Sequence, residues 1–218
     1  MTKIGAKNII LIATENQGKL GEIQDLLQGE GYSLKSLADY PQILSIDETG
    51  ETLEDNAREK AVEGAKKTGH ITLADDSSLE IEALDGEPGA HSKRFLGPGA
   101  AQDDRNRKIL ELMKGFRGER RRARFRCVIA IAQPDETVHL VQGECQGFIA
   151  ERPKGKGGFG YDPIFYLPRY GKTMAEIEPA VKNRMSHRGL AMEKAKGILR
   201  QILRGKEKRS GEKEGRSV

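Results

Sequence analysis

The spacing of apolar residues along the chain predicts strands and helices in alternation. Residues 7–14 form a continuous apolar run that ends in polar residues, which is typical of a strand buried on both faces. Apolar residues then recur at helical spacing through residues 19–31, where Gly29 and Gly31 predict the end of a helix. We therefore expect the chain to begin with a strand, a loop and a helix.

The same two patterns continue through the middle of the chain. Residues 51–69 repeat the helical spacing, and Thr52 is placed to cap that helix. Residues 70–76 and 78–84 each predict a strand, the second because apolar and polar positions alternate strictly. Residues 101–115 again have the spacing of a helix.

The last third of the chain predicts antiparallel strands and a long helix. Residues 123–150 contain two strand-like runs around a turn at Pro134 and Asp135. Residues 186–203 have the pattern of an amphipathic helix with Ser186 as its N-cap. This alternation predicts an α/β fold in which a mixed central sheet is flanked by helices.

The composition fits one domain followed by a charged tail. Of the 218 residues 36% are apolar, so we expect residues 1–203 to form a single domain of one or two lobes. Residues 204–218 are rich in Lys, Glu, Gly and Ser and predict a basic, disordered tail. This tail holds six basic and three acidic residues, which leaves 31 basic and 30 acidic residues elsewhere. The pI near 9.0 is therefore no argument for a nucleic-acid partner.

Compartment and redox state follow from what the sequence lacks. No apolar stretch approaches the ~18 residues of a membrane span, and the N-terminal residues have no signal-peptide cleavage pattern. We therefore expect a cytoplasmic protein with no membrane partner. Cys127 and Cys145 lie in separate strand-like runs without metal-ligand spacing, so both are expected to be reduced core residues.

Two adjacent carboxylates, Asp75 and Asp76, directly follow an apolar run and precede Ser77 and Ser78. Neighbouring side chains of an extended chain point to opposite faces, so one aspartate can face a ligand while the other anchors the chain. Carboxylate oxygens suit Mg²⁺, which uses one or two of them and completes its coordination with water and phosphate. Alternatively, the two aspartates only cap a loop that follows the strand.

The loop between the first strand and the first helix is a candidate anion site. It contains Thr14, Asn16 and Lys19, at a point where backbone N–H groups and the helix dipole attract phosphate. It is not a Walker A loop, because Ala13 and Leu20 replace the required Gly and Ser or Thr. An ordinary capped helix start with a solvated lysine explains the same residues.

An acidic pair and a lysine surround the start of the second helix. Asp47 and Glu48 precede this helix and Lys60 lies farther along it. Acidic residues near a helix N-terminus often act only on its dipole, so this segment is ambiguous on its own.

Two later segments offer contacts for a base and for phosphate or carbonyl oxygens. Residues 154–165 combine four glycines with Phe159, Tyr161 and Asp162, so backbone can approach a ligand and a ring can stack on a base. The second segment begins the last helix and carries donors suited to oxygen acceptors, namely Lys182, Ser186, His187 and Arg188. A glycine-rich hairpin and an exposed basic helix start are the structural alternatives.

An arginine-rich strand is the densest basic segment. Alternation places Arg122, Arg124 and Arg126 on one strand face, opposite Phe125 and Cys127. Aromatic residues that could stack on single-stranded nucleic acid are not interleaved with them. We therefore interpret this strand face as a surface exposed to solvent or to a protein interface.

Five motifs occur in this order: ATENQGK, ETGETLEDNAREKA, LADDSSLEIEALDGEPGAHSKRF, GGFGYDPIF and KNRMSHRGLA. Together they resemble the inosine triphosphate pyrophosphatase family, the XTP/dITP diphosphatases, over about residues 7–203. The resemblance implies a two-lobed α/β fold with the active site in the cleft, and a homodimer. It also implies Mg²⁺-dependent cleavage of a purine nucleoside triphosphate to the monophosphate and pyrophosphate.

The resemblance assigns the reacting groups and the metal ligands. Asp76 matches the general base and a metal ligand, and Lys19 is expected to stabilise the departing pyrophosphate together with Mg²⁺. Asp75 matches a further metal ligand. So do Asp47 and Glu48, either of which can be the direct contact.

The remaining matches are substrate contacts. His187 and Arg188 match the pair that senses the 6-keto oxygen of the purine. The other positions carried over as substrate contacts are Thr14, Glu15, Asn16, Gln17, Gly18, Lys19, Lys60, Ser77, Phe159, Gly160, Tyr161, Asp162 and Lys182.

Two positions depart from the family pattern. Ser78 stands where the family usually has glycine, and AHSKRF at residues 90–95 replaces the more usual YSARY.

Two alternative functions remain open from the sequence. One is a pyrophosphatase of similar fold that acts on modified pyrimidine nucleotides, and the other is a non-catalytic nucleic-acid-binding protein that uses the arginine strand and the basic tail.

Overall fold

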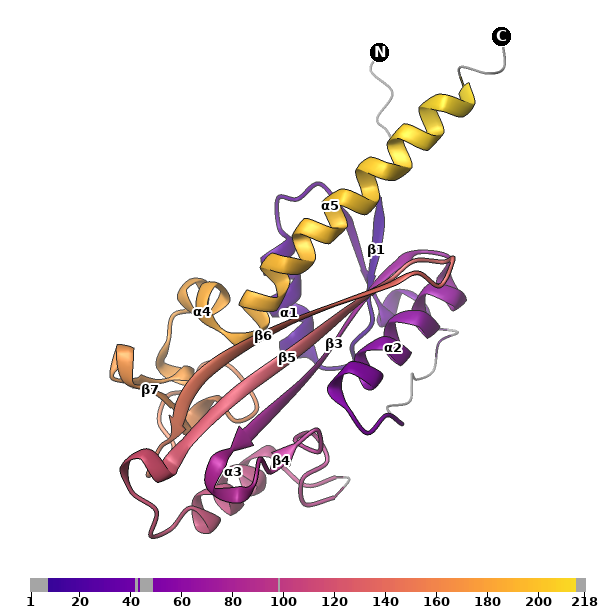
Figure 1. Ribbon diagram of the computed structural model, residues 1–218. Coiled ribbons are helices and arrows are strands. Elements are labelled where there is room, and N and C mark those ends of the chain that lie inside the picture. The colour runs from indigo at the N-terminus through magenta and orange to yellow at the C-terminus, as the bar shows by residue number, and fades with distance from the viewer. Residues whose placement is uncertain (1–7, 42, 44–48, 98, 215–218) are drawn as a thin grey trace.

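The computed structural model describes residues 8–41, 43, 49–97 and 99–214, and Figure 1 shows a long twisted sheet with helices on both faces. Within these residues the sheet has the strand order β2-β1-β3-β5-β6-β7-β8, and β4 pairs with β3. The strands are β1 Ile9–Ile12, β2 Ser33–Ser36, β3 Ile71–Ile81, β4 Pro88–Gly89, β5 Arg122–Ala132, β6 Val138–Ile149, β7 Phe165–Leu167 and β8 Lys172–Thr173. The helices are α1 Gln17–Leu27, α2 Leu53–Thr68, α3 Gln102–Leu112, α4 Pro179–Met185 and α5 His187–Glu214.

The sheet is mixed, as the sequence predicts. β1 pairs in parallel with β2 on one side and with the first residues of β3 on the other. From β3 onward every pairing is antiparallel, and β3, β5 and β6 are the long central strands.

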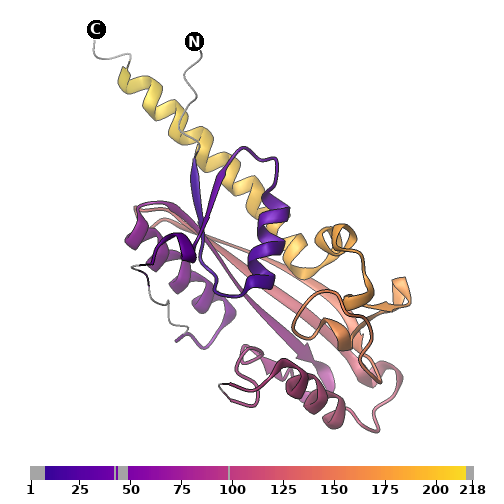
Figure 2. The ribbon, with the colours of Figure 1, turned by 180° about the vertical axis from the view of Figure 1, so that it is seen from behind.

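Two layers of helix cover the part of the sheet that contains β1. Apolar residues of α1 and α5 pack on one face, against the side chains of β1, β3 and β5 that point to that side. The alanine-rich face of α2 packs on the other, against Ala74, Val128 and Ala130. Figure 1 and Figure 2 show α1 and α2 on opposite sides of the strands.

A second lobe forms where the long strands continue past these helices. Its core joins the ends of β3, β5 and β6 to α3 and β7, and contains Leu79, Ile109, Phe125 and Phe165. The two lobes share one sheet, so residues carried by the long strands lie between them.

Local signals place the helix ends as predicted. Thr52 Oγ1 accepts a hydrogen bond from the backbone N–H of Asp55 at 3.1 Å, which caps α2, and Gly69 ends this helix in the left-handed conformation with φ of 70°. Ser186 Oγ accepts from the N–H of Gly189 at 3.2 Å at the start of α5.

The two strands predicted for residues 70–76 and 78–84 are in fact one continuous strand, β3. β5 pairs with β3 from Thr72 to Ile81, and this ladder keeps the backbone extended through the polar residues between them. Asp75 and Asp76, predicted as the last two residues of the first strand, therefore lie in the middle of a longer one, and the predicted strand end at residue 76 was wrong. Ser78, which replaces the usual glycine, is buried in this strand and donates to Glu80 at 3.0 Å.

The C-terminal segment also differs from the prediction of a disordered tail after residue 203. α5 continues to Glu214, past Leu203, which is the last core residue of the helix among those whose side chains the structure describes. Lys, Glu and Arg are good helix formers, and extending a helix that is already docked avoids the cost of nucleation. No helix in the described part of the chain is long and apolar enough to span a bilayer.

Candidate active site

The loop that joins β1 to α1 forms one wall of a cavity between the lobes. Asn16 Oδ1 accepts from the backbone N–H of Lys19 at 3.0 Å and caps α1, and Thr14 Oγ1 accepts from the N–H of Asn16 at 3.2 Å. Thr14, Asn16 and Lys19 all line the cavity. The N-terminal end of α1, where the helix dipole favours anions, therefore borders the cavity.

Asp75 and Asp76 lie just beyond the point where β1 ends. The β1 ladder stops at the pair Ile12 and Leu73, and β4 pairs with β3 only at Leu79 and Glu80, so this edge of β3 is open between these points. The two aspartates point to opposite faces, as the sequence predicts: Asp75 contacts α5, and Asp76 contacts α2. Lys19 reaches over the open edge, and its Nζ lies 3.2 Å from Asp75 Oδ2 and 3.9 Å from Asp76 Oδ1.

Asp75 is fully buried and held by cations. Its Oδ2 accepts from Arg188 Nε at 3.2 Å, from Arg188 Nη2 at 3.0 Å and from Ser77 Oγ at 3.1 Å. Burial by itself would raise the pKa of Asp75, but the charges of Lys19, Arg188 and Lys60 hold this pKa far below its usual range. Asp75 is thus a permanent anion that anchors the cations around it.

Asp76 is the carboxylate that lines the cavity. Its Oδ2 accepts from Asn56 Nδ2 at 3.1 Å, and its Oδ1 accepts from the backbone N–H of Ser77 at 3.0 Å. Lys60 Nζ lies 3.9 Å from Oδ1 and donates to the backbone carbonyl of Asp75 at 2.7 Å. These contacts fix the orientation of a carboxylate that is flanked by two lysines.

The donor set fits Mg²⁺. Asp75 Oδ1 is buried and has no hydrogen-bond partner among the described residues, and Asp76, the next residue of β3, lines the cavity. No group of three or more His, Cys, Asp or Glu side chains in the described part of the chain is placed to hold a metal ion. Mg²⁺ needs only one or two carboxylates when a triphosphate and water supply the remaining ligands. The predicted ligands Asp47 and Glu48 lie outside the described residues.

The glycine-rich segment forms the opposite wall. Asp162 Oδ2 accepts from the backbone N–H of Phe159 at 2.9 Å and is paired with Lys182. Gly158 has φ of +67°, and a Cβ there would lie 2.1 Å from Asp162 Oδ2, so only glycine fits. Lys182 Nζ lies 4.9 Å from the centroid of the Phe159 ring, and the guanidinium carbon of Arg188 lies 5.4 Å from it.

Glu22 is a residue of this site that the sequence analysis missed. Its carboxylate bridges two buried cations, at 2.7 Å from Lys182 Nζ and 2.7 Å from Arg188 Nη1. It lies three residues after Lys19 on α1, a spacing that places both side chains on one helix face and could have indicated it. Asn56 was also missed, although it lies four residues before Lys60 on α2.

His187 is buried and uncharged. Its ring stacks on Phe125 with centroids 4.7 Å apart, and its Nδ1 has no hydrogen-bond partner among the described residues. Burial, followed by the charges of Arg188 and Lys182, lowers the pKa of His187 well below its usual value. A neutral imidazole offers a neighbour one donor and one acceptor.

Arg188 is 2% exposed and is tied to the protein by most of its donors. Of the five N–H bonds of a guanidinium, four donate to Glu22, Asp75 and Ser77 within the described residues. One N–H, on Nη1, remains for a ligand. Arg188 can therefore give a single hydrogen bond to a carbonyl oxygen in the cavity.

Most of the residues predicted from the sequence converge on this one cavity. Those that line it are Thr14, Glu15, Asn16, Lys19, Lys60, Asp76, Ser77, Phe159, Gly160, Tyr161, Asp162, Lys182, His187 and Arg188. Gln17 and Gly18 lie on α1 outside this lining, and Asp75 lies beneath it. The hydroxyl of Tyr161 donates to the backbone carbonyl of Ser92 at 2.8 Å, so it supports the segment.

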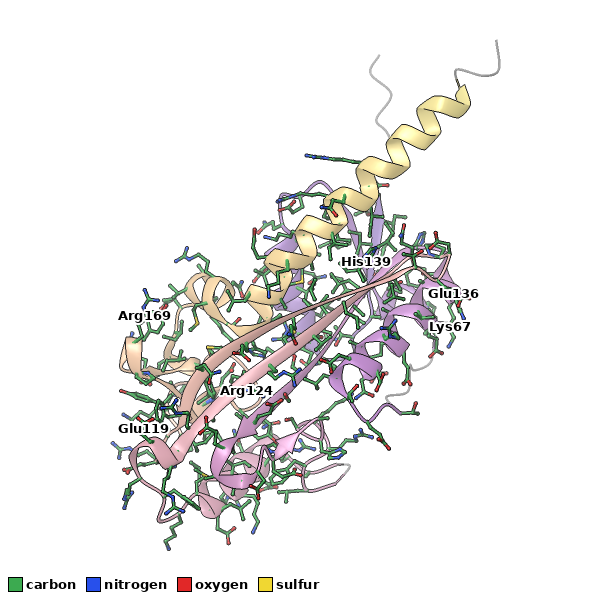
Figure 3. All side chains as sticks on the ribbon, in the orientation of Figure 1. Lys67, Glu119, Arg124, Glu136, His139 and Arg169 are labelled. Carbon is green, nitrogen blue, oxygen red and sulfur yellow. The ribbon has the colours of Figure 1, made fainter. Side chains whose placement is uncertain are left out.

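The arginine strand is neutralised by glutamates. Arg124 Nε lies 2.6 Å from Glu80, and Arg126 lies 3.3 Å from the same carboxylate and 3.1 Å from Glu54. Arg122 is paired with Glu119, and Figure 3 shows Arg124 and Glu119 on the second lobe. Because these charges are balanced in place, the face offers little net attraction to a phosphate backbone.

The cysteines are reduced and buried, as predicted. Burial, together with the nearby Asp75 carboxylate, raises the pKa of the Cys127 thiol to about 12. Burial likewise raises the pKa of Cys145 to about 11. Both thiols are therefore protonated at neutral pH and are poor nucleophiles.

Comparison with known proteins identifies one family. The Ham1 family model matches residues 10–198. A dITP/XTP pyrophosphatase from Desulforamulus reducens is 46% identical over 193 residues, which are 88% of this chain and 96% of that protein. One from Geobacillus kaustophilus is 44% identical over 198 residues, which are 90% and 97% of the two chains.

Solved structures agree with this result. A HAM1 protein from Coxiella burnetii has a TM-score of 0.80 and 40% identity, and the match covers 89% of this chain and 99% of that one. The Ham1 protein of Staphylococcus aureus has a TM-score of 0.79 and 35% identity, with 89% and 100% covered.

Proposed function

The chain belongs to the Ham1 family, and from this we propose that it is an enzyme that hydrolyses non-standard purine nucleoside triphosphates to the monophosphate and pyrophosphate. ITP, dITP and XTP are the proposed substrates. The observation that carries the proposal is the position of Asp76, beside Lys19 and Lys60, in the same cavity as the cations near Phe159. The groups proposed to bind phosphate and those proposed to bind the base thus line one cavity.

In the proposed reaction a water molecule attacks the α-phosphorus. Asp76 accepts the proton of this water, and the bond from the α-phosphorus to the oxygen that bridges it to the β-phosphorus breaks. Pyrophosphate leaves with this oxygen, and Lys19 at the start of α1 stabilises the charge that develops on it. Asn56 and the N–H of Ser77 keep the Asp76 carboxylate oriented toward the cavity.

A divalent cation completes the charge balance. Mg²⁺ held by Asp76 and Asp75 would supply Lewis-acid neutralisation of the triphosphate oxygens. Asp47 and Glu48 are further proposed ligands. Lys60 is bound to the Asp75 carbonyl and contributes a fixed positive charge beside the same oxygens.

Base selection is proposed to rest on Arg188 and His187. The remaining N–H of Arg188 can donate to a 6-keto oxygen, as inosine and xanthine present, while the 6-amino group of adenine would set donor against donor. A site built to hydrogen-bond one group can reject its analogue by as much as ~10⁴-fold. ATP is therefore expected to be a poor substrate.

We also propose, from the family resemblance, that the protein acts as a homodimer in the cytoplasm. Sedimentation equilibrium at micromolar concentration tests the assembly, since a dimer has twice the 24.1 kDa mass of the chain. A species of monomer mass at all concentrations would contradict it.

The function is tested by release of pyrophosphate from a nucleotide panel. The panel contains ITP, XTP, dITP, ATP and modified pyrimidine triphosphates, with and without Mg²⁺, and Asp76→Asn is the inactive control. We expect kcat/KM for ITP and XTP at least 100-fold above that for ATP, and activity only with Mg²⁺. Equal efficiency with ITP and ATP, or a preference for the pyrimidines, would overturn the assignment.

A further inference from the structure

Gly18 lies at a place where α1 touches the glycine-rich wall of the cavity. A Cβ built on Gly18 would lie 2.4, 2.6 and 2.8 Å from three ring carbons of Phe159. Ordinary contact begins at 3.4 Å, so a side chain at position 18 would displace the ring by about 1 Å. Gly21, one turn farther along the same helix, has nothing within 4 Å of such a Cβ. The close approach is therefore specific to Gly18.

The segment that carries Phe159 is otherwise held by hydrogen bonds to its backbone. In KGKGGFG, residues 154–160, Phe159 is the only apolar side chain. The N–H of Gly157 donates to the carbonyl of Ala175, the N–H of Phe159 donates to Asp162, and the side chain of Asn106 donates to the carbonyl of Gly160. Gly155, Gly158 and Gly160 have positive φ angles, so the segment follows a path that most residues disfavour. The Phe159 ring is thus the one apolar side chain with which residues 154–160 can pack against α1.

The same helix fixes the other groups around this ring. Lys19 projects from α1 to the two aspartates, and Glu22 holds Lys182 and Arg188, which both lie within 6 Å of the Phe159 ring centroid. One rigid helix therefore sets the distance between the phosphate end of the cavity and its base end.

We propose that Gly18 is a positioning residue that acts through Phe159. Because Gly18 has no side chain, the Phe159 ring packs directly on α1, and this contact places residues 155–160 at the correct distance from the loop between β1 and α1. This inference rests on the proposed function for its kinetic consequence, because a displaced ring would weaken nucleotide binding. It does not require Gly18 to touch the nucleotide. Asp76, Asn56 and Lys60 belong to elements that this contact does not hold, so the chemical step should be largely preserved.

The first test compares Gly18→Ala with Gly21→Ala. Both variants replace a glycine of α1 with alanine, a change that by itself favours the helix. For Gly18→Ala we expect the KM for ITP to rise at least tenfold, while kcat stays within about threefold. Gly21→Ala should keep both values. A loss of general stability would lower the active fraction, and so kcat, in either variant, and would leave KM unchanged.

A second measurement is independent of turnover. Hydrogen–deuterium exchange without nucleotide should be at least fivefold faster for amides in residues 156–160 of Gly18→Ala and unchanged in Gly21→Ala. If the wild-type protein hydrolyses none of the nucleotides tested but this exchange difference is found, the proposed function is wrong and the contact between Gly18 and Phe159 is supported. If wild type is active and the two variants exchange and turn over alike, the role of Gly18 is wrong.

A double variant decides whether Gly18 acts through the ring. In a Phe159→Ala background the clash is absent, so Gly18→Ala should cause less than a twofold further change in KM. An undiminished tenfold effect would mean that position 18 contacts the nucleotide directly, and would overturn the proposal. If Gly18→Ala alone does not fold, recovery of folding in the double variant supports the same contact, and failure of both to fold contradicts it.

Discussion

Asn56 on α2 donates its side-chain amide to Oδ2 of Asp76 on β3 across 3.1 Å, and the two residues are only 1% and 6% exposed. The acceptor is a carboxylate, which requires the NH₂ side of the amide to face it. The second oxygen of Asp76 is fixed by the N–H of Ser77. The proposed base therefore has one orientation, set by two elements that meet behind the cavity.

Replacing Asn56 with leucine removes this donor and keeps the branching and the number of heavy atoms of the side chain. A hydrogen bond to a charged group contributes about 1.5–3 kcal/mol, so we expect Asn56→Leu to lower kcat by at least about tenfold. Steady-state kinetics with ITP measures the change, and Arg58→Leu on the exposed side of α2 is the matched control. A folded Asn56→Leu protein with the kcat of wild type would show that Asp76 needs no such support.

Removing Arg188 should destabilise the whole protein. Asp75 and Glu22 would both lose a buried cation, and breaking a buried pair in this way costs about 3–5 kcal/mol. Urea unfolding should show this loss for Arg188→Ala and less than about 0.5 kcal/mol for Arg184→Ala, whose side chain is exposed. Equal stability of the two variants would contradict the buried network. Selectivity assays on Arg188→Ala must therefore be made on protein shown to be folded.

The buried neutral His187 predicts a pH dependence of stability. Its pKa in the folded state lies well below 6.5, so the unfolded chain takes up the proton first as the pH falls. The contribution of His187 to the free energy of unfolding is thus complete above pH 6.5. Below pH 6.5 it is lost by up to about 1.4 kcal/mol per pH unit. Urea unfolding between pH 7 and 5 gives the free energy of unfolding at each pH. The slope of this free energy against pH should be smaller for His187→Gln than for wild type. The exposed His91→Gln variant should keep the slope of wild type, and an unchanged slope in His187→Gln would exclude this account.

Truncation after Leu203 should change little besides the helix content. Among the side chains that the structure describes, Leu203 is the last residue of α5 in the core cluster, and the helix beyond it, residues 204–214, extends past the strands in Figure 1. We expect turnover unchanged, the Tm within about 2 °C and a smaller helical signal in circular dichroism. A large loss of Tm would mean that this part of α5 packs on the fold.

Local patterns were sufficient for α1, α2, α3 and the first part of α5, for two caps and for the mixed character of the sheet, but they did not predict α4. Apolar spacing predicted α1, α2 and α5 because each helix needs one apolar face, and Thr52 and Ser186 cap because their hydroxyl groups lie beside unpaired N–H groups. Strand alternation also placed Asp75 and Asp76 on opposite faces. These properties depend on neighbours within a few residues, so the sequence expresses them directly.

Local patterns could not predict that β3 is one continuous strand, nor which residues its two aspartates contact. β3 is one strand because β5, about fifty residues later, pairs along its polar stretch, and Asp75 is anchored because Arg188 on α5 reaches it. Glu22 gains its role only when α4 and α5 bring Lys182 and Arg188 beside α1. The burial of these charges depends on partners more than a hundred residues away in the chain, because a buried carboxylate is stable only where distant cations converge on it.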